Sequence, residues 1–319
     1  MERILCCMLL TMVTCLLAAP AAAQPYPSRP IKLIVPYPAG GNTDIVARMF
    51  SQKLSERLGQ PVVVDNRGGA AGALGMAAAT KSPNDGYTLV VGDLGSLVIA
   101  PLANPNAGYV PQKDLAPISL VSSVSIVVSA NPKSPDVTFA DFLARAKAQP
   151  GKLTYGTGGI GGPGHLAFEQ LRSMTGVDIL HVPFKGGAQA VSGLLGEQVD
   201  LVVDGTAMAQ VKGGRLKALA VTGPRLPALP DVPGIGETVT GFNFTNWWGF
   251  LAPAGAPADA VKRVNEELTA IAALPDVREK LRDLGLAAQS STPQQFNDLI
   301  RVETDKVAKI IKDAGIKFE

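Results

Sequence analysis

The chain has 319 residues, of which 18% are charged, and its formal net charge of +2 excludes the strongly basic composition of proteins that bind nucleic acid or anionic membranes. Its two histidines, and three cysteines confined to the first 15 residues, argue against a transition-metal site in the body of the chain. The length fits two domains of about 150 residues each.

The first 23 residues predict a secretory signal that is cleaved after Ala23. Arg3 precedes an apolar run over residues 4–19, and small residues stand just before Gln24. An uncleaved membrane anchor is the alternative, but the run is shorter than the roughly 20 residues that a span requires. All three cysteines lie within the signal and are removed with it, so we expect a periplasmic protein without thiols or disulfides.

After residue 30, short apolar strands alternate with amphipathic helices. The expected strands are 31–35, 62–64 and 87–91, and the expected helices are 44–58 and 71–81. In the first helix, Val46, Phe50 and Leu54 recur at the helical period, and Gly59 ends it. Such alternation with short connections is typical of a parallel sheet.

A second block repeats this pattern. Its expected strands are 153–155, 179–182, 199–203 and 216–221, and its expected helices are 163–174 and 188–195. Helices at 257–271 and 293–314 follow, and Thr292 with Gln295 predicts a capping box at the start of the last one.

Two β-rich segments, 117–128 and 246–251, separate the second block from the rest of the chain. We interpret them as crossing hinge strands, so that the second block is inserted into the first. The sequence therefore predicts a two-lobed α/β fold with two parallel-rich sheets. The expected division is a signal at 1–23, one lobe from 24–124 and 247–319, and an inserted lobe from 125–246.

Two glycine-rich turns, 38–44 and 156–165, each lie between an expected strand and an expected helix. Such a turn leaves backbone N–H groups unpaired at a helix start, where they and the helix dipole attract an anion. Turns in both blocks predict one anionic ligand held from two sides.

The second turn, 156–161, also matches the G-x-G-x-x-G pattern of dinucleotide sites. The acidic residue that such sites place at the end of the next strand is absent, because Asp178 precedes that strand. We therefore favour a small anion. The remaining alternative is a glycine turn that only lets a helix pack closely on the sheet.

The sequence offers little for catalysis, since it contains no G-x-S-x-G, S-x-x-K or H-E-x-x-H motif. His165 falls in the first helical turn after the second glycine loop, where the dipole favours the neutral ring. Its ring either supports the structure or donates to a ligand oxygen. His181 lies within an apolar strand pattern and is predicted to be a core or hinge histidine.

Three further positions follow expected strands, where parallel-sheet proteins bind ligands. Asp93 either caps the next turn or pairs with an amino group of the ligand. Phe184 and Lys185 precede a helix, and Lys185 has the alternative of an ordinary solvated charge. Asp204 ends a strand and has the alternative of a helix cap.

Several stretches together resemble a known family, the solute-binding proteins of tripartite tricarboxylate transporters, also called Bug proteins. The matching stretches are 26–44, 66–72, 82–89, 181–187 and 229–233, and the similarity extends over the chain after residue 25. The resemblance implies a type II-like periplasmic binding protein that closes on a small organic acid and presents it to a permease of one large and one small subunit. It implies no cofactor and no catalysis.

The predicted ligand-binding residues combine the two loops with the strand-end positions. They are Tyr37, Ala39, Gly40, Gly41, Asn42, Thr43, Asp44, Asp93, Gly156, Thr157, Gly158, Gly159, Ile160, Gly161, His165, Phe184, Lys185 and Asp204. The chain departs from the family where members often carry a serine shortly before the histidine, because residues 161–164 are Gly-Gly-Pro-Gly.

The function we expect is capture of a small carboxylate, whether a di- or tricarboxylate, an aromatic acid or an amino acid, by a monomer that binds no nucleic acid. A periplasmic enzyme acting on such a compound and a ligand-presenting sensory protein are the alternatives. The sequence does not name the acid.

Overall fold

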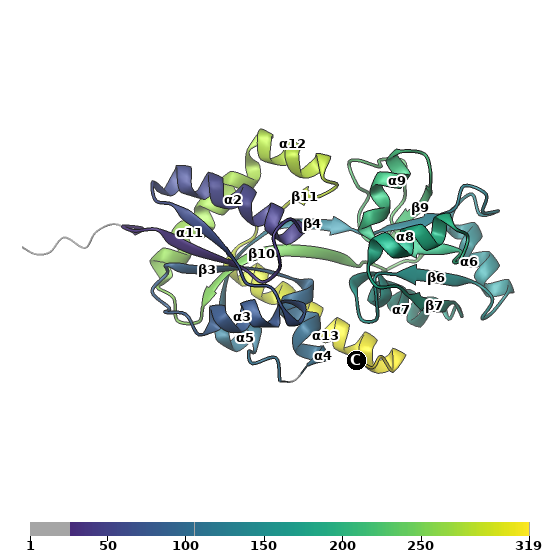
Figure 1. Ribbon diagram of the computed structural model, residues 1–319, viewed down its shortest axis with the longest axis horizontal. Coiled ribbons are helices and arrows are strands. Elements are labelled where there is room, and N and C mark those ends of the chain that lie inside the picture. The colour runs from purple at the N-terminus through teal and green to yellow at the C-terminus, as the bar shows by residue number, and fades with distance from the viewer. Residues whose placement is uncertain (1–25, 105, 319) are drawn as a thin grey trace, which may run out of the picture.

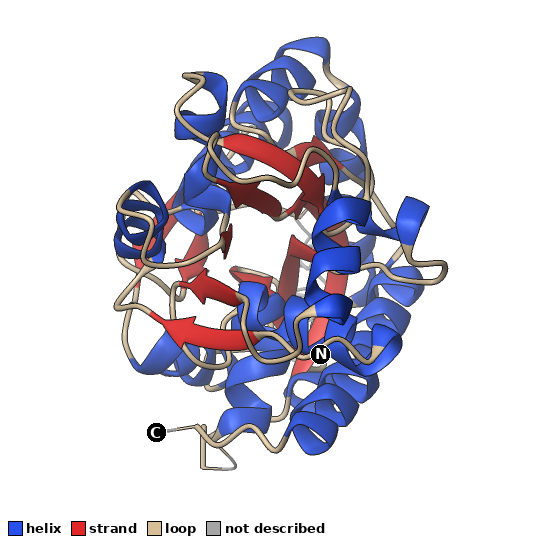
Figure 2. Cartoon of the chain, turned by 90° about the vertical axis from the view of Figure 1, so that its right-hand side faces the viewer, coloured by secondary structure: helices blue, strands red, loops and turns tan. Residues whose placement is uncertain are grey.

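The computed structural model describes residues 26–104 and 106–318, which fold into two α/β lobes (Figure 1). The predicted signal at 1–23 and the start at Gln24 lie outside the described residues. The first lobe contains a six-stranded sheet of order β11-β4-β10-β3-β1-β2, and the second a five-stranded sheet of order β7-β6-β8-β5-β9. In an end-on view, helices surround the strands of these sheets (Figure 2). The expected two-lobed α/β fold is thereby confirmed.

The strands of the first sheet are β1 (Ile31–Val35), β2 (Val62–Asn66), β3 (Thr88–Asp93), β4 (Leu115–Ser125), β10 (Thr245–Pro253) and β11 (Ala287–Ala288). Those of the second are β5 (Val127–Ala130), β6 (Thr154–Thr157), β7 (Leu180–Pro183), β8 (Leu201–Val203) and β9 (Lys217–Val221).

The α-helices are α2 (Asn42–Leu58), α3 (Ala73–Thr80), α4 (Ala100–Ala103), α5 (Pro111–Asp114), α6 (Phe139–Ala148), α7 (Pro163–Thr175), α8 (Gly187–Leu195), α9 (Met208–Lys212), α10 (Ile235–Thr238), α11 (Ala258–Ala273), α12 (Pro275–Asp283) and α13 (Pro293–Ala314). Two 3₁₀ turns, η1 (Ala70–Gly72) and η3 (Gly205–Ala207), and a π-helical turn, η2 (Gly95–Ile99), complete the description. None of the described helices is long and apolar enough to cross a membrane.

Both sheets are mixed, so the expectation of parallel-rich sheets was wrong. β1 runs parallel to β2 and β3, and β6 runs parallel to β7 and β8. Antiparallel pairs occur where the chain passes between the lobes, because β10 returns alongside β4 over nearly its whole length. β4 ends at Ser125 and β5 begins at Val127, so one continuous segment serves both sheets. β4 and β10 are thus the predicted crossing strands (Figure 1).

The elements that carry the glycine loops form for simple reasons. On α2, Val46, Phe50 and Leu54 are fully buried against the sheet, and Gly59 ends the helix with φ +68°. This confirms the predicted apolar stripe and helix end. Parallel β1, β2 and β3 bring their carboxyl ends to one edge, beside the start of α2.

The last helix, α13, contacts both lobes. Its first turn is held by the predicted capping box of Thr292 and Gln295, and Phe296 packs edge-on against Trp247 of the hinge strand β10. Its other end packs on α7 of the second lobe (Figure 1). Beyond this end, the ring of Phe318 lies so close to Gly161 that a Cβ added there would be 2.1 Å from it. The chain end therefore supports the second glycine loop.

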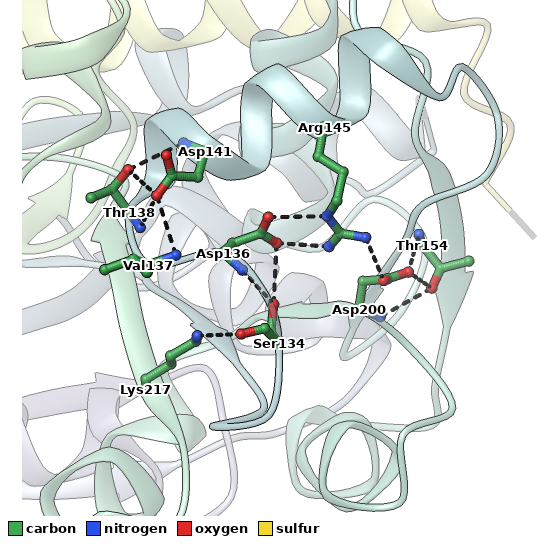
Figure 3. A network of polar contacts seen from close by, with 9 residues as sticks. All are labelled: Ser134, Asp136, Val137, Thr138, Asp141, Arg145, Thr154, Asp200 and Lys217. Atoms are coloured by element: carbon green, nitrogen blue, oxygen red, sulfur yellow. Dashed lines mark hydrogen bonds and ion pairs between the residues drawn. The ribbon is translucent and has the colours of Figure 1, made fainter.

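A polar network joins α6 to neighbouring segments of the second lobe (Figure 3). Asp136 is only 2% exposed, and its carboxylate accepts two hydrogen bonds from Arg145, at 3.0 and 2.7 Å. Arg145 also donates to Asp200 at 3.3 Å. The other oxygen of Asp200 accepts from the N–H and hydroxyl of Thr154. The network joins α6 to the sheet through charge-assisted bonds in a bidentate arrangement.

Candidate functional site

Two adjoining cavities lie between the lobes. We call the first the loop cavity. It has a volume of about 490 Å³ and is lined by Tyr37, Pro38, Ala39, Gly41, Asn42, Thr43, Asp93, Gly95, Pro163, Asn246 and Trp248. We call the second the hinge cavity. It has a volume of about 290 Å³ and is lined by Asn42, Val124, Ser125, Ile126, Val127, Pro163, Gly164, Val203, Asp204, Gly205, Thr206, Met208, Asn246, Leu284, Gly285 and Leu286. Asn42, Pro163 and Asn246 line both, so the two cavities form one cleft.

The first glycine loop presents backbone donors to the loop cavity. Within the described residues, the N–H groups of Gly41, Asn42, Thr43 and Asp44 donate to no protein acceptor, as expected at the start of α2. Gly40 turns the chain with φ +92°, a conformation that favours glycine. These unpaired donors and the positive end of the α2 dipole make this point favourable for an anion.

The carboxylate of Asp44 holds the first glycine loop in position through hydrogen bonds. Its carboxylate is 3% exposed and accepts from the Gly40 N–H, Arg48 Nε and Asn66 Nδ2, each at 2.9 Å. Burial would raise the pKa of this carboxyl, but the hydrogen bonds from Arg48, Gly40 and Asn66 hold it below its ordinary value. Asp44 lines neither cavity, so its geometry fits a positioning role for the loop.

Asp93 lies at the carboxyl end of β3 and is 7% exposed on the wall of the loop cavity. Its Oδ1 accepts from the Tyr37 hydroxyl at 2.9 Å and from the Ser96 N–H and hydroxyl at 2.8 and 2.7 Å. Among the described residues, its Oδ2 accepts from the Thr43 hydroxyl alone, at 3.3 Å. Oδ1 therefore caps η2, as one of the sequence-based alternatives predicted, while Oδ2 keeps unused acceptor capacity.

A chain of donors fixes the orientation of this carboxylate. The indole N–H of Trp248 donates to the Thr43 hydroxyl at 2.9 Å, which directs the hydroxyl proton of Thr43 toward Asp93. Burial and the neighbouring Asp93 raise the pKa of the Tyr37 hydroxyl, so it remains a donor. Thr43 and Tyr37 thus direct their protons to the carboxylate.

Two strand ends and a helix start meet in the second lobe. A Cβ added at Gly158 would lie 2.9 Å from the Gly187 nitrogen and 3.2 Å from Asp204 Oδ2, so the ends of β6 and β8 and the start of α8 are in contact. Asp204 Oδ1 accepts from the Thr206 N–H and hydroxyl at 2.9 and 2.7 Å, which caps η3. Asp204 also lines the hinge cavity. Asp204 therefore caps a helical turn, as the alternative predicted, and also lines the cleft.

The second glycine loop uses part of its backbone internally. The Gly161 N–H donates to His165 Nδ1 at 2.9 Å, and the Gly159 and Gly162 N–H groups donate within the loop. The loop reaches the cleft through Pro163 and Gly164. Pro163 has no N–H, but the N–H groups of Gly164 and His165 donate to no described acceptor, so the start of α7 also keeps donors for a ligand.

The two histidines stack on each other below this loop, with ring centroids 3.9 Å apart. His181 Nε2 lies 2.7 Å from the Thr157 hydroxyl, and His165 Nε2 lies 3.6 Å from Glu169 Oε1. Burial, the neighbouring His165 and Arg172 lower the pKa of His181 to about 3, and burial is also the main cause that lowers the pKa of His165. Both rings are neutral at pH 7, and His165 lines neither cavity.

This histidine pair makes stability depend on pH. His181 takes up its proton near pH 6.5 in the unfolded chain but near pH 3 in the folded protein, so the unfolded state binds more protons between these values. We therefore expect the free energy of unfolding, measured by urea titration, to fall as the pH is lowered from about 6.5 to about 3. A His181→Gln variant should show a shallower decrease. Equal pH profiles for the two proteins would contradict this assignment.

The structure brings only some of the predicted residues to the cleft. Tyr37, Ala39, Gly41, Asn42, Thr43, Asp93 and Asp204 line it. Gly40, Asp44, Gly156, Thr157, Gly158, Gly159, Ile160, Gly161, His165, Phe184 and Lys185 line neither cavity. The ring of Phe184 packs against Gly156 and Gly193, and Lys185 is exposed.

Sequence reasoning missed Asn246 and Trp248 as lining residues. Both were placed in an expected strand, and residues two apart in a strand share a face. That spacing was the available signal, but it could not say which face turns to the cleft. Among the described residues, no cluster of three or more metal-ligating side chains occurs.

Residues 46–316 match the family described as "Tripartite tricarboxylate transporter family receptor". The chain belongs to this family. BugT of Bordetella pertussis, a relative of this receptor, is 33% identical over 324 residues, which covers 100% of this chain and 99% of BugT. The resemblance to Bug proteins is thereby confirmed.

Two solved structures of relatives contain bound acids. An R. palustris protein with adipate has a TM-score of 0.77 and 33% identity, covering 92% of this chain and 99% of its own. MatC from Rhodopseudomonas palustris with bound malate has a TM-score of 0.71 and 30% identity, covering 90% and 100%. This receptor therefore shares its fold with solute-binding proteins over most of its length.

Proposed function

We propose that the chain is a periplasmic receptor that captures a small organic carboxylate in the cleft between its lobes and delivers it to the membrane permease subunits of a tripartite transporter. The observation that carries the proposal is the group of unpaired N–H donors at the start of α2, where Gly41, Asn42 and Thr43 line the loop cavity. The relatives solved with adipate and malate support a carboxylate as the ligand class.

In this proposal the ligand is released unchanged. The lobe of residues 24–124 and 247–319 contributes the first loop, and the lobe of residues 125–246 contributes Pro163, Gly164 and the edge around Asp204. Closure about β4 and β10 brings the two sides together around the acid. The remaining predicted contacts of the second loop, Gly156–Gly161 and His165, would then approach the ligand from the inserted lobe.

A panel of small carboxylic acids tests this proposal. An acid that binds only the folded protein, present at about 100 times its dissociation constant, adds about 2.7 kcal/mol to the free energy of unfolding. We expect a rise in melting temperature and a heat of binding by calorimetry, with no loss of the acid by NMR. The primary amide of each acid is the matched control, because it keeps the shape without the charge and should bind weakly.

Two results would contradict the proposal. The absence of any thermal or calorimetric response across mono-, di-, tri- and aminocarboxylic acids would show that the protein does not capture carboxylates. Consumption of the bound acid would favour an enzyme.

A further inference from the structure

The cleft contains charges of one sign only. Among the residues that line the two cavities, the charged side chains are Asp93 in the loop cavity and Asp204 in the hinge cavity. The basic residues next to the loops do not line it. Arg48 is paired with Asp44, and Lys185 is exposed on the second lobe.

Asp93 lies beside the anion position that the proposed function assigns. Its Oδ2 is 3.3 Å from the hydroxyl of Thr43, and Thr43 is also the second residue of α2 with one of the unpaired N–H groups. A ligand carboxylate bound at the start of α2 therefore comes close to a second carboxylate. Two like charges in this arrangement repel each other unless a cation lies between them.

The hydrogen bonds of Asp93 indicate what its free oxygen requires. Four donors point at the carboxylate, three of them at Oδ1, which is the pattern of an ionised group. Oδ2 has one long bond, from the Thr43 hydroxyl. It has room for a further donor, and no described basic side chain supplies one. The acidic side chains of the cleft thus complement a hydrogen-bond donor, whereas the helix start complements an anion.

Resting on the proposed function, we infer that the receptor selects carboxylates that also carry an ammonium group, and that Asp93 is the residue that distinguishes them from dicarboxylates. The ligand carboxylate occupies the N–H groups of Gly41 to Asp44. The ammonium lies against Asp93 Oδ2. A second carboxylate in place of the ammonium is repelled by Asp93, because no cation lies between the two charges.

The test compares isosteric acids by calorimetry. Within each series the substituent changes from ammonium to methyl to carboxylate at one chain length. The series are glycine, propanoate and malonate; 3-aminopropanoate, butanoate and succinate; and 4-aminobutanoate, pentanoate and glutarate. In the series that fits the cavity, we expect the amino acid to bind at least tenfold more tightly than its methyl analogue, and the dicarboxylate most weakly.

The Asp93→Asn variant tests whether Asp93 causes the preference for the amino acid over its methyl analogue. We expect the ratio of amino to methyl affinity to fall about tenfold or more, while the methyl analogue binds as well or better. Asp65→Asn removes one charge elsewhere on the same lobe, where Asp65 pairs with Arg67, and should leave the ratio unchanged. If Asp204→Asn alone lowers the ratio, the ammonium lies in the hinge cavity and the assignment to Asp93 is wrong.

The outcomes distinguish a failure of the proposed selectivity from a failure of the proposed function. If dicarboxylates bind the wild-type protein as well as or better than their amino counterparts, the selectivity is overturned while carboxylate capture stands, and this comparison needs no variant to fold. If no acid of any series binds, the proposed function fails and the inference fails with it.

Discussion

Replacing Arg145 with methionine should lower the free energy of unfolding by about 3–5 kcal/mol. The physical reason is that Asp136 remains 2% exposed after the change, without the two hydrogen bonds from the guanidinium that satisfy its charge (Figure 3). Asp200 loses its bond to Arg145 as well. Urea titration monitored by circular dichroism measures the effect.

Arg215→Met is the matched control, because Arg215 is exposed on the same lobe and forms no ion pair within the described residues. It should change stability by no more than about 0.5 kcal/mol. Adding Asp136→Asn to Arg145→Met should restore part of the loss, since the second change removes the unpaired charge. Equal losses for Arg145→Met and Arg215→Met would show that the network does not stabilise the lobe.

Replacing Gly41 with proline should weaken carboxylate binding about ten- to more than a hundredfold. Proline removes the N–H of Gly41, and a charge-assisted hydrogen bond to an anion contributes about 1.5–3 kcal/mol. The fold should survive, because Gly41 has φ −80°, a Cβ there meets no atom within 4 Å, and the N–H donates to no described acceptor. Calorimetry with the tightest acid of the panel gives the ratio of affinities.

Gly41→Ala isolates the missing N–H from the added side chain, because alanine adds a Cβ and keeps the donor. It should bind within about threefold of the wild-type protein. Arg48→Ala tests recognition by a side chain instead, and we expect a smaller loss than for the proline variant. Loss of binding in Arg48→Ala with full binding in folded Gly41→Pro would show that a guanidinium, not the backbone, holds the acid.

Much of the fold could be predicted because local patterns determine it. The apolar stripe of α2, the glycine that ends it, and the capping box of α13 each specify their element without distant contacts. The separation of β4 from β5 could not be predicted in detail, because the apolar run continues through Ile126 while the chain changes sheets there. α6 and α12 were not predicted, although Thr138 with Asp141 forms a capping box at the start of α6.

The site was predictable where it depends on chain position alone. Loops after parallel strands gather at one sheet edge, so the first glycine loop and Asp93 were expected to lie near each other. The chain from Trp248 through Thr43 to Asp93 was not predictable, since its members are distant in sequence and meet through side-chain geometry. Local patterns likewise gave no reason for His165 to stack on His181.

A crystal structure of the receptor with the tightest acid of the panel tests the central claim most directly. The account predicts a carboxylate of the ligand within hydrogen-bond distance of the N–H groups of Gly41 to Asp44, with the two lobes closed about β4 and β10 around it. A ligand bound outside the cleft, or a carboxylate held by a basic side chain while the start of α2 makes no contact with it, would contradict the account.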